Sequence, residues 1–145
     1  MMKCDEVMTK NLECCLPGDK VTEVATMMKR GNIGPIPVIE NGKTQKLIGI
    51  VTDRDLALKV VAEGLNPRDT KVEAVMTRKL VTCLAGDDLQ KALDAMSEHQ
   101  LRRIPIVDDN YKILGIISQA DVATRVNRQE KTATLVKGIS QPNAK

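Results

Sequence analysis

The chain has 145 residues, of which 42% are hydrophobic and 28% are charged, a composition typical of a soluble globular protein. Its net charge is only +3, its basic residues are scattered, and it has no Trp, no Phe and one Tyr. Nucleic-acid binding, which needs a basic track and stacking rings, is therefore not expected. No stretch approaches the roughly 18 apolar residues of a membrane span, and Asp5 and Glu6 interrupt any signal peptide. We expect a cytoplasmic protein that has no membrane contact.

A repeat runs through most of the chain. The opening Val-Met-Thr of the first copy recurs 68 positions later, and so does an Ile-Pro segment. A Gly-containing apolar segment recurs 66 positions later, and the two missing residues fall beside the turn signal Asn41 and Gly42, where a fold tolerates insertions best. The matching segments are 7–9 with 75–77, 36–39 with 104–107, and 47–52 with 113–118.

Each copy predicts the same elements in the same order. A short strand comes first, over 12–16 and over 80–84. A helix follows, because apolar residues recur at i, i+3, i+4 and i+7 in both copies. Two strands joined by a tight turn come next, and a second helix begins near Asp53 and near Gln119. This order predicts an α+β fold of two β-α-β-β-α units.

Neither copy should fold alone, because about 60 residues bury too little apolar surface. We therefore expect the copies to pack sheet to sheet about a pseudo-two-fold axis. The expected boundaries are 1–63 for the first unit, 64–71 for a linker, 72–127 for the second unit and 128–145 for a C-terminal tail. Weak periodicity in the tail indicates a short helix over 133–139.

One segment combines residue types that suit a ligand site. The last strand of each copy ends in a hydroxyl residue with an Asp three positions later, Thr52 with Asp55 and Ser118 with Asp121. Such a pair at a helix start is typical of a capping box, which is purely structural. The same geometry suits a nucleotide, because a helix N-terminus attracts phosphate and the Asp can accept hydrogen bonds from a ribose diol. Its occurrence in both copies favours the ligand interpretation.

The motifs together resemble the CBS domain. Val-Met-Thr, the Ile-Pro strand, and the Gly-led apolar strand followed by the hydroxyl and Asp occur in this order twice, from about Cys4 to Arg125. Two in tandem resemble a CBS pair, or Bateman module, and the chain is similar to stand-alone bacterial CBS-pair proteins of the stress or hypoxic-response type. The resemblance implies a regulatory module that signals by conformational change to a downstream protein, a homodimer, and no enzyme activity.

The resemblance also implies a ligand between the two copies. CBS pairs usually bind AMP, ADP, ATP or S-adenosylmethionine, with the motif Asp on the ribose and basic residues of the other copy's Pro strand on phosphate. Beyond this adenine nucleotide, no cofactor and no metal is implied. The expected first cleft combines Thr52 and Asp55 with Arg102 and Arg103. The expected second cleft combines Ser118 and Asp121 with Gly34 and Pro35, and is expected to contain no side-chain cation.

Two other interpretations stay open. One is a ligand-free protein-interaction module. The other is a redox or metal sensor, although the four cysteines show no Cys-x-x-Cys pair and no zinc spacing. These cysteines are Cys4, Cys14, Cys15 and Cys83. The single histidine, His99, has no base-orienting partner in the sequence pattern, so it does not predict an active site.

Overall fold

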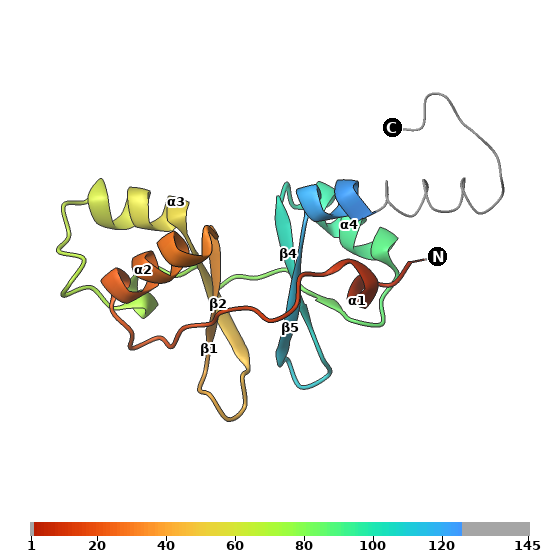
Figure 1. Cartoon of the computed structure of the whole chain (residues 1–145), viewed down its shortest axis with the longest axis horizontal. Helices are drawn as coiled ribbons and strands as arrows, with labels where there is room; N and C mark the ends of the chain where they lie inside the picture. Colours follow the sequence, from red (N-terminus) through yellow and green to blue (C-terminus); the bar gives the residue numbers. More distant parts are fainter. Residues whose placement is uncertain (1, 126–145) are drawn as a thin grey trace.

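Two antiparallel hairpins form the centre of the molecule, one from each copy of the repeat (Figure 1). The structure is a computed structural model that describes residues 2–125. The hairpins are β1 (Pro35–Ile39) with β2 (Leu47–Thr52), and β4 (Arg103–Val107) with β5 (Ile113–Ser118). Their registers are equivalent, since Pro35 lies opposite Thr52 and Arg103 lies opposite Ser118. The repeat in the sequence is therefore a repeat in space.

Two amphipathic helices cover these hairpins. α2 (Val21–Gly31) buries Val24 in the core of copy one, and α4 (Leu89–Glu98) buries Ala92 in the core of copy two. α2 ends at Asn32, which adopts the left-handed conformation with φ 50° and donates its N–H to a carbonyl of the last turn. This residue type tolerates that conformation well.

The other elements are short. They are α1 (Cys4–Val7), α3 (Asp53–Leu56), the π-helical turn η1 (Ala57–Val61), the 3-10 turn η2 (Val72–Ala74) and β3 (Cys83–Leu84). β3 pairs in parallel with β4 and is shorter than the strand expected over 80–84. The strand expected over 12–16 is reduced to one bridge between Cys15 and Val38, because only two backbone hydrogen bonds form there.

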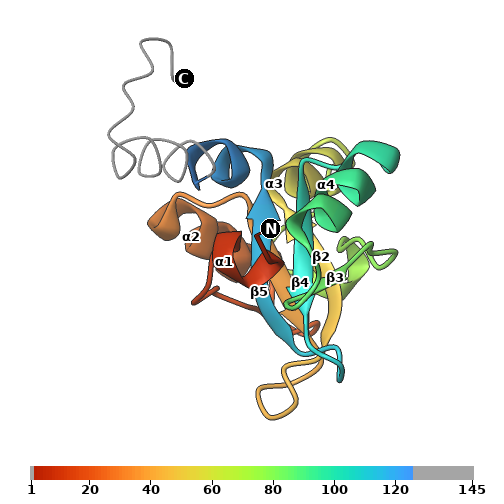
Figure 2. The ribbon, with the colours of Figure 1, turned by 90° about the vertical axis from the view of Figure 1, so that its right-hand side faces the viewer.

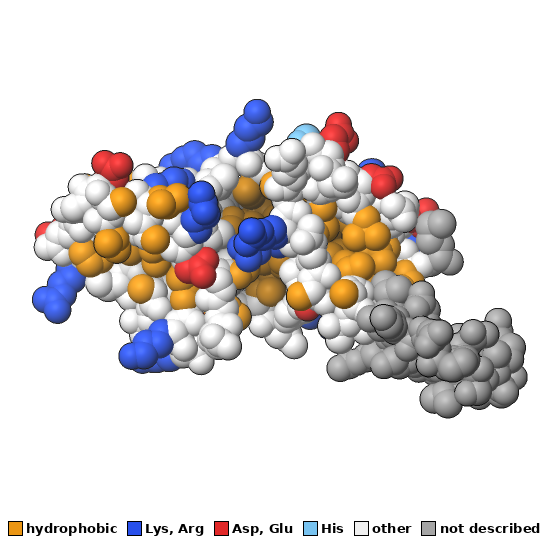
Figure 3. All heavy atoms as spheres, turned by 90° about the horizontal axis from the view of Figure 1, so that it is seen from above, with side chains coloured by type: hydrophobic (Ala, Val, Ile, Leu, Met, Phe, Trp, Pro, Cys, Tyr) orange, Lys and Arg blue, Asp and Glu red, His pale blue; other side chains and the backbone are white. Residues whose placement is uncertain are grey.

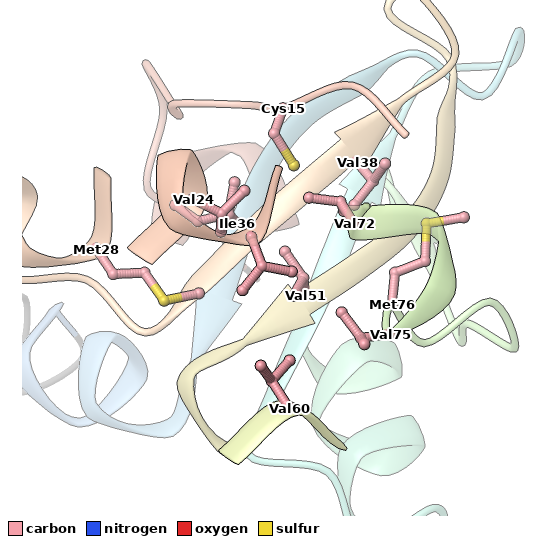
Figure 4. Close-up of a cluster of buried hydrophobic side chains, with 11 residues drawn as sticks. Cys15, Val24, Met28, Ile36, Val38, Val51, Val60, Val72, Val75 and Met76 are labelled. Carbon is pink, nitrogen blue, oxygen red and sulfur yellow. The ribbon is translucent and has the colours of Figure 1, made fainter. Parts of the chain in front are cut away.

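The opening segment of each repeat packs on the core of the other half. α1 and Met8 lie in a buried cluster with the strands and helix of copy two, and Figure 2 shows α1 beside β5. Thr9 exchanges two backbone hydrogen bonds with Ile116, of 2.8 and 3.1 Å. In the same way η2 and Met76 enter the core of copy one (Figure 4). The core of each copy is thus completed by the opening segment of the other copy. We call these two segments, 4–9 and 72–77, the exchanged segments.

Two glycines allow the opening segments to pack this closely on the opposite copy. A Cβ on Gly115 of β5 would lie 2.6 Å from the sulfur of Met8 and 2.9 Å from the carbonyl oxygen of Thr9. A Cβ on Gly49 of β2 would meet Met76 in the same way, 2.8 Å from its sulfur. Since interiors are close-packed, any side chain at these two positions would push the exchanged segment away.

The two halves meet through their hairpins. A buried cluster between them consists of Ile39, Leu47, Ile50, Val107 and Ile113. The backbone joins them as well, because the Leu47 N–H donates to the Tyr111 carbonyl at 3.0 Å and the Ile113 N–H donates to the Gln45 carbonyl at 3.1 Å. The predicted α+β fold of two units packed sheet to sheet is confirmed.

The start of the second helix of each copy also agrees with the sequence. α3 begins at Asp53, and a helical segment begins at Gln119. Within the described part of the chain, no helix is both long and apolar enough to cross a membrane. The tail 128–145 and the helix expected over 133–139 lie outside the described residues.

Gly115→Ala is expected to lower the free energy of unfolding by about 1–3 kcal/mol, because the added methyl group overpacks the contact with Met8 and Thr9. Gly86→Ala is the matched control, since a Cβ on Gly86 meets no atom within 4 Å. Its effect should stay within about 0.5 kcal/mol. Urea unfolding followed by circular dichroism measures both. Equal stability of the two variants would contradict the packing of Met8 on β5.

Candidate functional site

Thr52 and Asp55 form a capping box at the start of α3. The Asp55 N–H donates to Thr52 Oγ1 at 3.1 Å, and the Thr52 N–H donates to Asp55 Oδ2 at 2.9 Å. The other Asp55 oxygen pairs with Lys59 Nζ at 3.1 Å, and only 13% of the Asp55 side chain is exposed. The structural role of this motif is therefore confirmed in copy one, and the ribose-binding role of Asp55 stays a prediction.

The motif of copy two has different partners. The Asp121 N–H donates to Ser118 Oγ at 3.1 Å, and the Thr9 hydroxyl donates to Asp121 Oδ2 at 3.1 Å. Arg125 stands where copy one has Lys59, but it donates to the Glu6 carbonyl at 3.3 Å instead. The two motif aspartates, although equivalent in sequence, thus face different surroundings.

A cavity of about 460 Å³ opens between the two copies beside the start of α3. Thr52 of copy one lines it together with Arg102 and Arg103 of copy two. The structure thus brings together three of the four residues predicted for the first cleft. Asp55 is not part of the lining, because it is held in the capping box; the neighbouring Asp53 is part of it.

Basic side chains dominate this first cleft. Arg54 and Lys79 join Arg102 and Arg103, and Asp53 is the one carboxylate among the lining residues that the structure describes. Four cations against one carboxylate leave a formal net charge of +3. The rest of the wall is largely apolar, with Ile50, Leu80, Val81, Leu101 and Pro105. Figure 3, which views the molecule from above, shows basic side chains near the middle of that face beside hydrophobic surface. An anion with an apolar part suits such a cavity.

The second cleft lies at the pseudo-symmetric place and has a volume of about 630 Å³. Ser118 and Asp121 line it together with Gly34 and Pro35, as the sequence predicted. The expectation that it contains no side-chain cation is wrong, because Arg103 lines both cavities. The reason is its position: Arg103 begins β4 directly opposite Ser118, at the boundary of the two copies.

Some lining residues come from the exchanged segments and the chain that follows them, and the motifs in the sequence did not predict these. They are Thr9, Asn11 and Glu13 in the second cleft, and Thr77, Lys79 and Val81 in the first. The repeat itself held a signal, since these residues are equivalent at a shift of 68 positions. Using that signal required knowing which half each segment packs against.

The cysteines lack the properties of reactive thiols. Cys4, Cys15 and Cys83 are buried, and Cys14 is half-buried. Burial raises the pKa of the Cys15 thiol to about 12 and that of Cys4 to about 11, and it also raises the pKa values of Cys14 and Cys83. A thiol that stays protonated is a poor nucleophile and metal ligand, which disfavours the redox interpretation.

No metal centre is visible within residues 2–125, where no three His, Cys, Asp or Glu side chains gather closely enough to hold an ion. His99 is exposed and caps the C-terminal end of α4. The described residues therefore offer the two clefts as the candidate site.

The comparisons with known proteins identify the repeat. The family model for the CBS domain matches residues 4–62 and 72–128. The CBS domain-containing protein YhcV of Bacillus subtilis is 36% identical over 143 residues, which cover 99% of each chain. Hypoxic response protein 1 of Mycobacterium tuberculosis is 28% identical over 144 residues, which cover 99% of this chain and 98% of the relative.

Solved structures show the same fold. Hypoxic Response Protein I with two coordinated zinc ions superposes with a TM-score of 0.75 at 28% identity, covering 85% of this chain and 98% of its own. The CBS domain pair of MJ0100 in complex with 5′-methylthioadenosine and S-adenosyl-L-methionine has a TM-score of 0.77 at 22% identity, with coverages of 89% and 98%. CBSX2 in complex with AMP has a TM-score of 0.76 at 22% identity, with coverages of 90% and 99%.

Proposed function

This chain belongs to the CBS-domain family as a tandem pair, and we propose that it is a regulatory module that binds an adenine nucleotide between its two CBS domains. The observation that carries the proposal is the first cleft, a cavity with a net positive lining and an apolar wall. Its volume of about 460 Å³ falls within the range of roughly 300–1,000 Å³ that is usual for small-molecule sites.

The chemistry of the cleft suits AMP, ADP or ATP. Arg102 and Arg103 offer planar, bidentate donors for phosphate oxygens, and Lys79 adds a point charge. The Thr52 hydroxyl can donate to a phosphate or sugar oxygen. With no Trp and no Phe in the chain, the adenine ring lies between aliphatic side chains such as Ile50 and Pro105.

Asp55 is proposed as the acceptor for the ribose hydroxyls. Its Oδ1 already pairs with Lys59, whose side chain is 45% exposed and whose ammonium also donates to the Val75 carbonyl at 2.9 Å. A ribose diol entering the cleft competes with this lysine for the carboxylate. Ser118 and Asp121 are proposed to hold the equivalent groups of a ligand in the second cleft.

Two structural neighbours support an adenosine-containing ligand. MJ0100 binds 5′-methylthioadenosine and S-adenosyl-L-methionine, and CBSX2 binds AMP. Both share the fold of this chain at 22% identity, so they support the class of ligand for a fold of this kind. The cavity charge in this chain is what favours a phosphorylated member of that class in the first cleft.

Regulation follows from the place of the cleft. A nucleotide held by Thr52 of one copy and Arg102 of the other bridges the two halves. Such a ligand favours whichever packing of the halves it binds better, and a downstream protein that contacts both halves then detects the shift. The nucleotide therefore acts as an allosteric signal.

Asp55→Ala is expected to reduce ATP affinity by about 10- to 100-fold, because it removes charge-assisted hydrogen bonds worth about 1.5–3 kcal/mol. Asp121→Ala, the equivalent change in the other copy, is the matched control and should have a much smaller effect on ATP. Asp55→Asn separates binding from capping, since its amide oxygen can still accept from the Thr52 N–H. Calorimetric titration with ATP and AMP, at low and high salt, measures all three.

Three results would contradict this assignment. They are unchanged ATP affinity in both Asp55 variants, a larger loss in Asp121→Ala than in Asp55→Ala, or affinity that does not weaken as salt rises. The affinity is expected to weaken with salt because exposed phosphate contacts with Arg and Lys are screened by salt. No binding of AMP or ATP to the unmodified protein would favour a ligand-free interaction module instead.

We also propose that the protein is a homodimer. Leu58, Val61 and Leu65 expose 49%, 76% and 46% of their surface on one short segment after α3, and a second copy would cover them. Val61→Asp is expected to give a monomer, because a buried unpaired carboxylate opposes association. Glu63→Ala on the same segment is the control and should leave the dimer intact. Light scattering at micromolar concentration measures the mass, and a monomeric unmodified protein would contradict the proposal.

A further inference from the structure

The two clefts share the groups that would contact the uncharged part of a nucleoside. Each has a hydroxyl at the strand end, a threonine from the exchanged segment and two aliphatic side chains at equivalent positions. The equivalent pairs are Ser118 with Thr52, Thr9 with Thr77, Leu12 with Leu80, and Ile116 with Ile50. The clefts therefore present similar walls to a nucleoside.

They differ in charge at four other equivalent pairs. The pairs, second cleft first, are Asn11 with Lys79, Glu13 with Val81, Gly34 with Arg102, and Ala120 with Arg54. Every one of these differences makes the first cleft more positive by one unit. Among residues 2–125, Arg103 is the one cation that lines the second cleft, against Glu13 and Asp121, which gives a formal net charge of −1 there and +3 in the first cleft.

Glu13 is the residue that distinguishes the clefts by repulsion. Asp121 also lines the second cleft, but copy one has a carboxylate at the equivalent position, Asp55, although Asp55 does not line the first cleft. Glu13 has an apolar counterpart, Val81. Its carboxylate lies beside the end of α2, with Oε2 3.7 Å from the place where a Cβ on Gly31 would be. Glu13 lines the second cleft and forms no ion pair within residues 2–125, so no described cation neutralises its carboxylate there.

We propose that the second cleft selects a nucleoside ligand without net negative charge, and that Glu13 excludes phosphate from it. The inference rests on the proposed function, since it takes the first cleft as the nucleotide site. Among the described residues, a phosphate in the second cleft would meet two carboxylates and a single cation, Arg103. An uncharged or cationic ligand meets no such repulsion.

Exchanging the residues at the equivalent positions 13 and 81 tests whether Glu13 excludes phosphate from the second cleft. Glu13→Val gives the second cleft the residue of the first, and Val81→Glu does the reverse. Glu13→Gln removes the charge and keeps the shape, so it controls for altered packing. The probes are ATP and adenosine, which share the nucleoside and differ in charge. Calorimetric titration gives the number of sites and the affinities, and thermal unfolding checks that each variant is folded.

The unmodified chain should bind one ATP. Glu13→Val and Glu13→Gln should each add a second ATP site, with an affinity gain there of about tenfold or more. Val81→Glu should weaken ATP in the first cleft by about tenfold and change adenosine affinity by less than about threefold, because only the phosphates meet the new carboxylate.

Two ATP molecules per unmodified chain, or one ATP in both Glu13 variants, would overturn the inference and leave the proposed function standing. A second site in Glu13→Val that is missing in Glu13→Gln would also overturn it, since size and not charge would then be the cause. Binding of neither ATP nor adenosine to the unmodified chain would remove the proposed function and this inference with it.

Discussion

The close contact between each exchanged segment and a glycine of the opposite strand is the constraint on which the structure depends. Met8 lies over Gly115 and Met76 over Gly49, so each half of the repeat is completed by the start of the other. This arrangement explains physically why one copy should not fold alone: removing either copy would also remove a piece of the remaining core. It ties the two halves into one folding unit in addition to the hairpin interface between them.

The same exchange builds the clefts and makes them unequal. Once an exchanged segment has paired with the opposite strand, the residues that follow it lie along the cleft, which is how Lys79 reaches the first cleft and Glu13 the second. The strand pairing fixes the backbone, and the side chains beyond it are free to differ between copies. A duplicated fold can in this way keep its symmetry and still carry two sites of different charge.

The repeat predicted the hairpins, the helices and the meeting of Thr52 with Arg102, because pseudo-symmetry brings the end of one copy's strand beside the start of the other's. It could not predict the exchange, since 7–9 and 75–77 are the same three residues and the pattern does not state which half each joins. The ion pair between Asp55 and Lys59 could not be predicted either, because it depends on the side-chain direction of Lys59. Arg103 lines both clefts because the two clefts lie close together, and a repeat pattern in the sequence does not contain that distance.

A crystal structure of the protein grown with ATP tests the central claim, that a bridging cleft of net positive charge receives the nucleotide. The account predicts one ATP per chain, with its phosphates against Arg102 and Lys79, its ribose toward Asp55 and its adenine on the aliphatic wall near Pro105. Phosphates located against Glu13 and Asp121, or a nucleotide that contacts only one of the two copies, would contradict it.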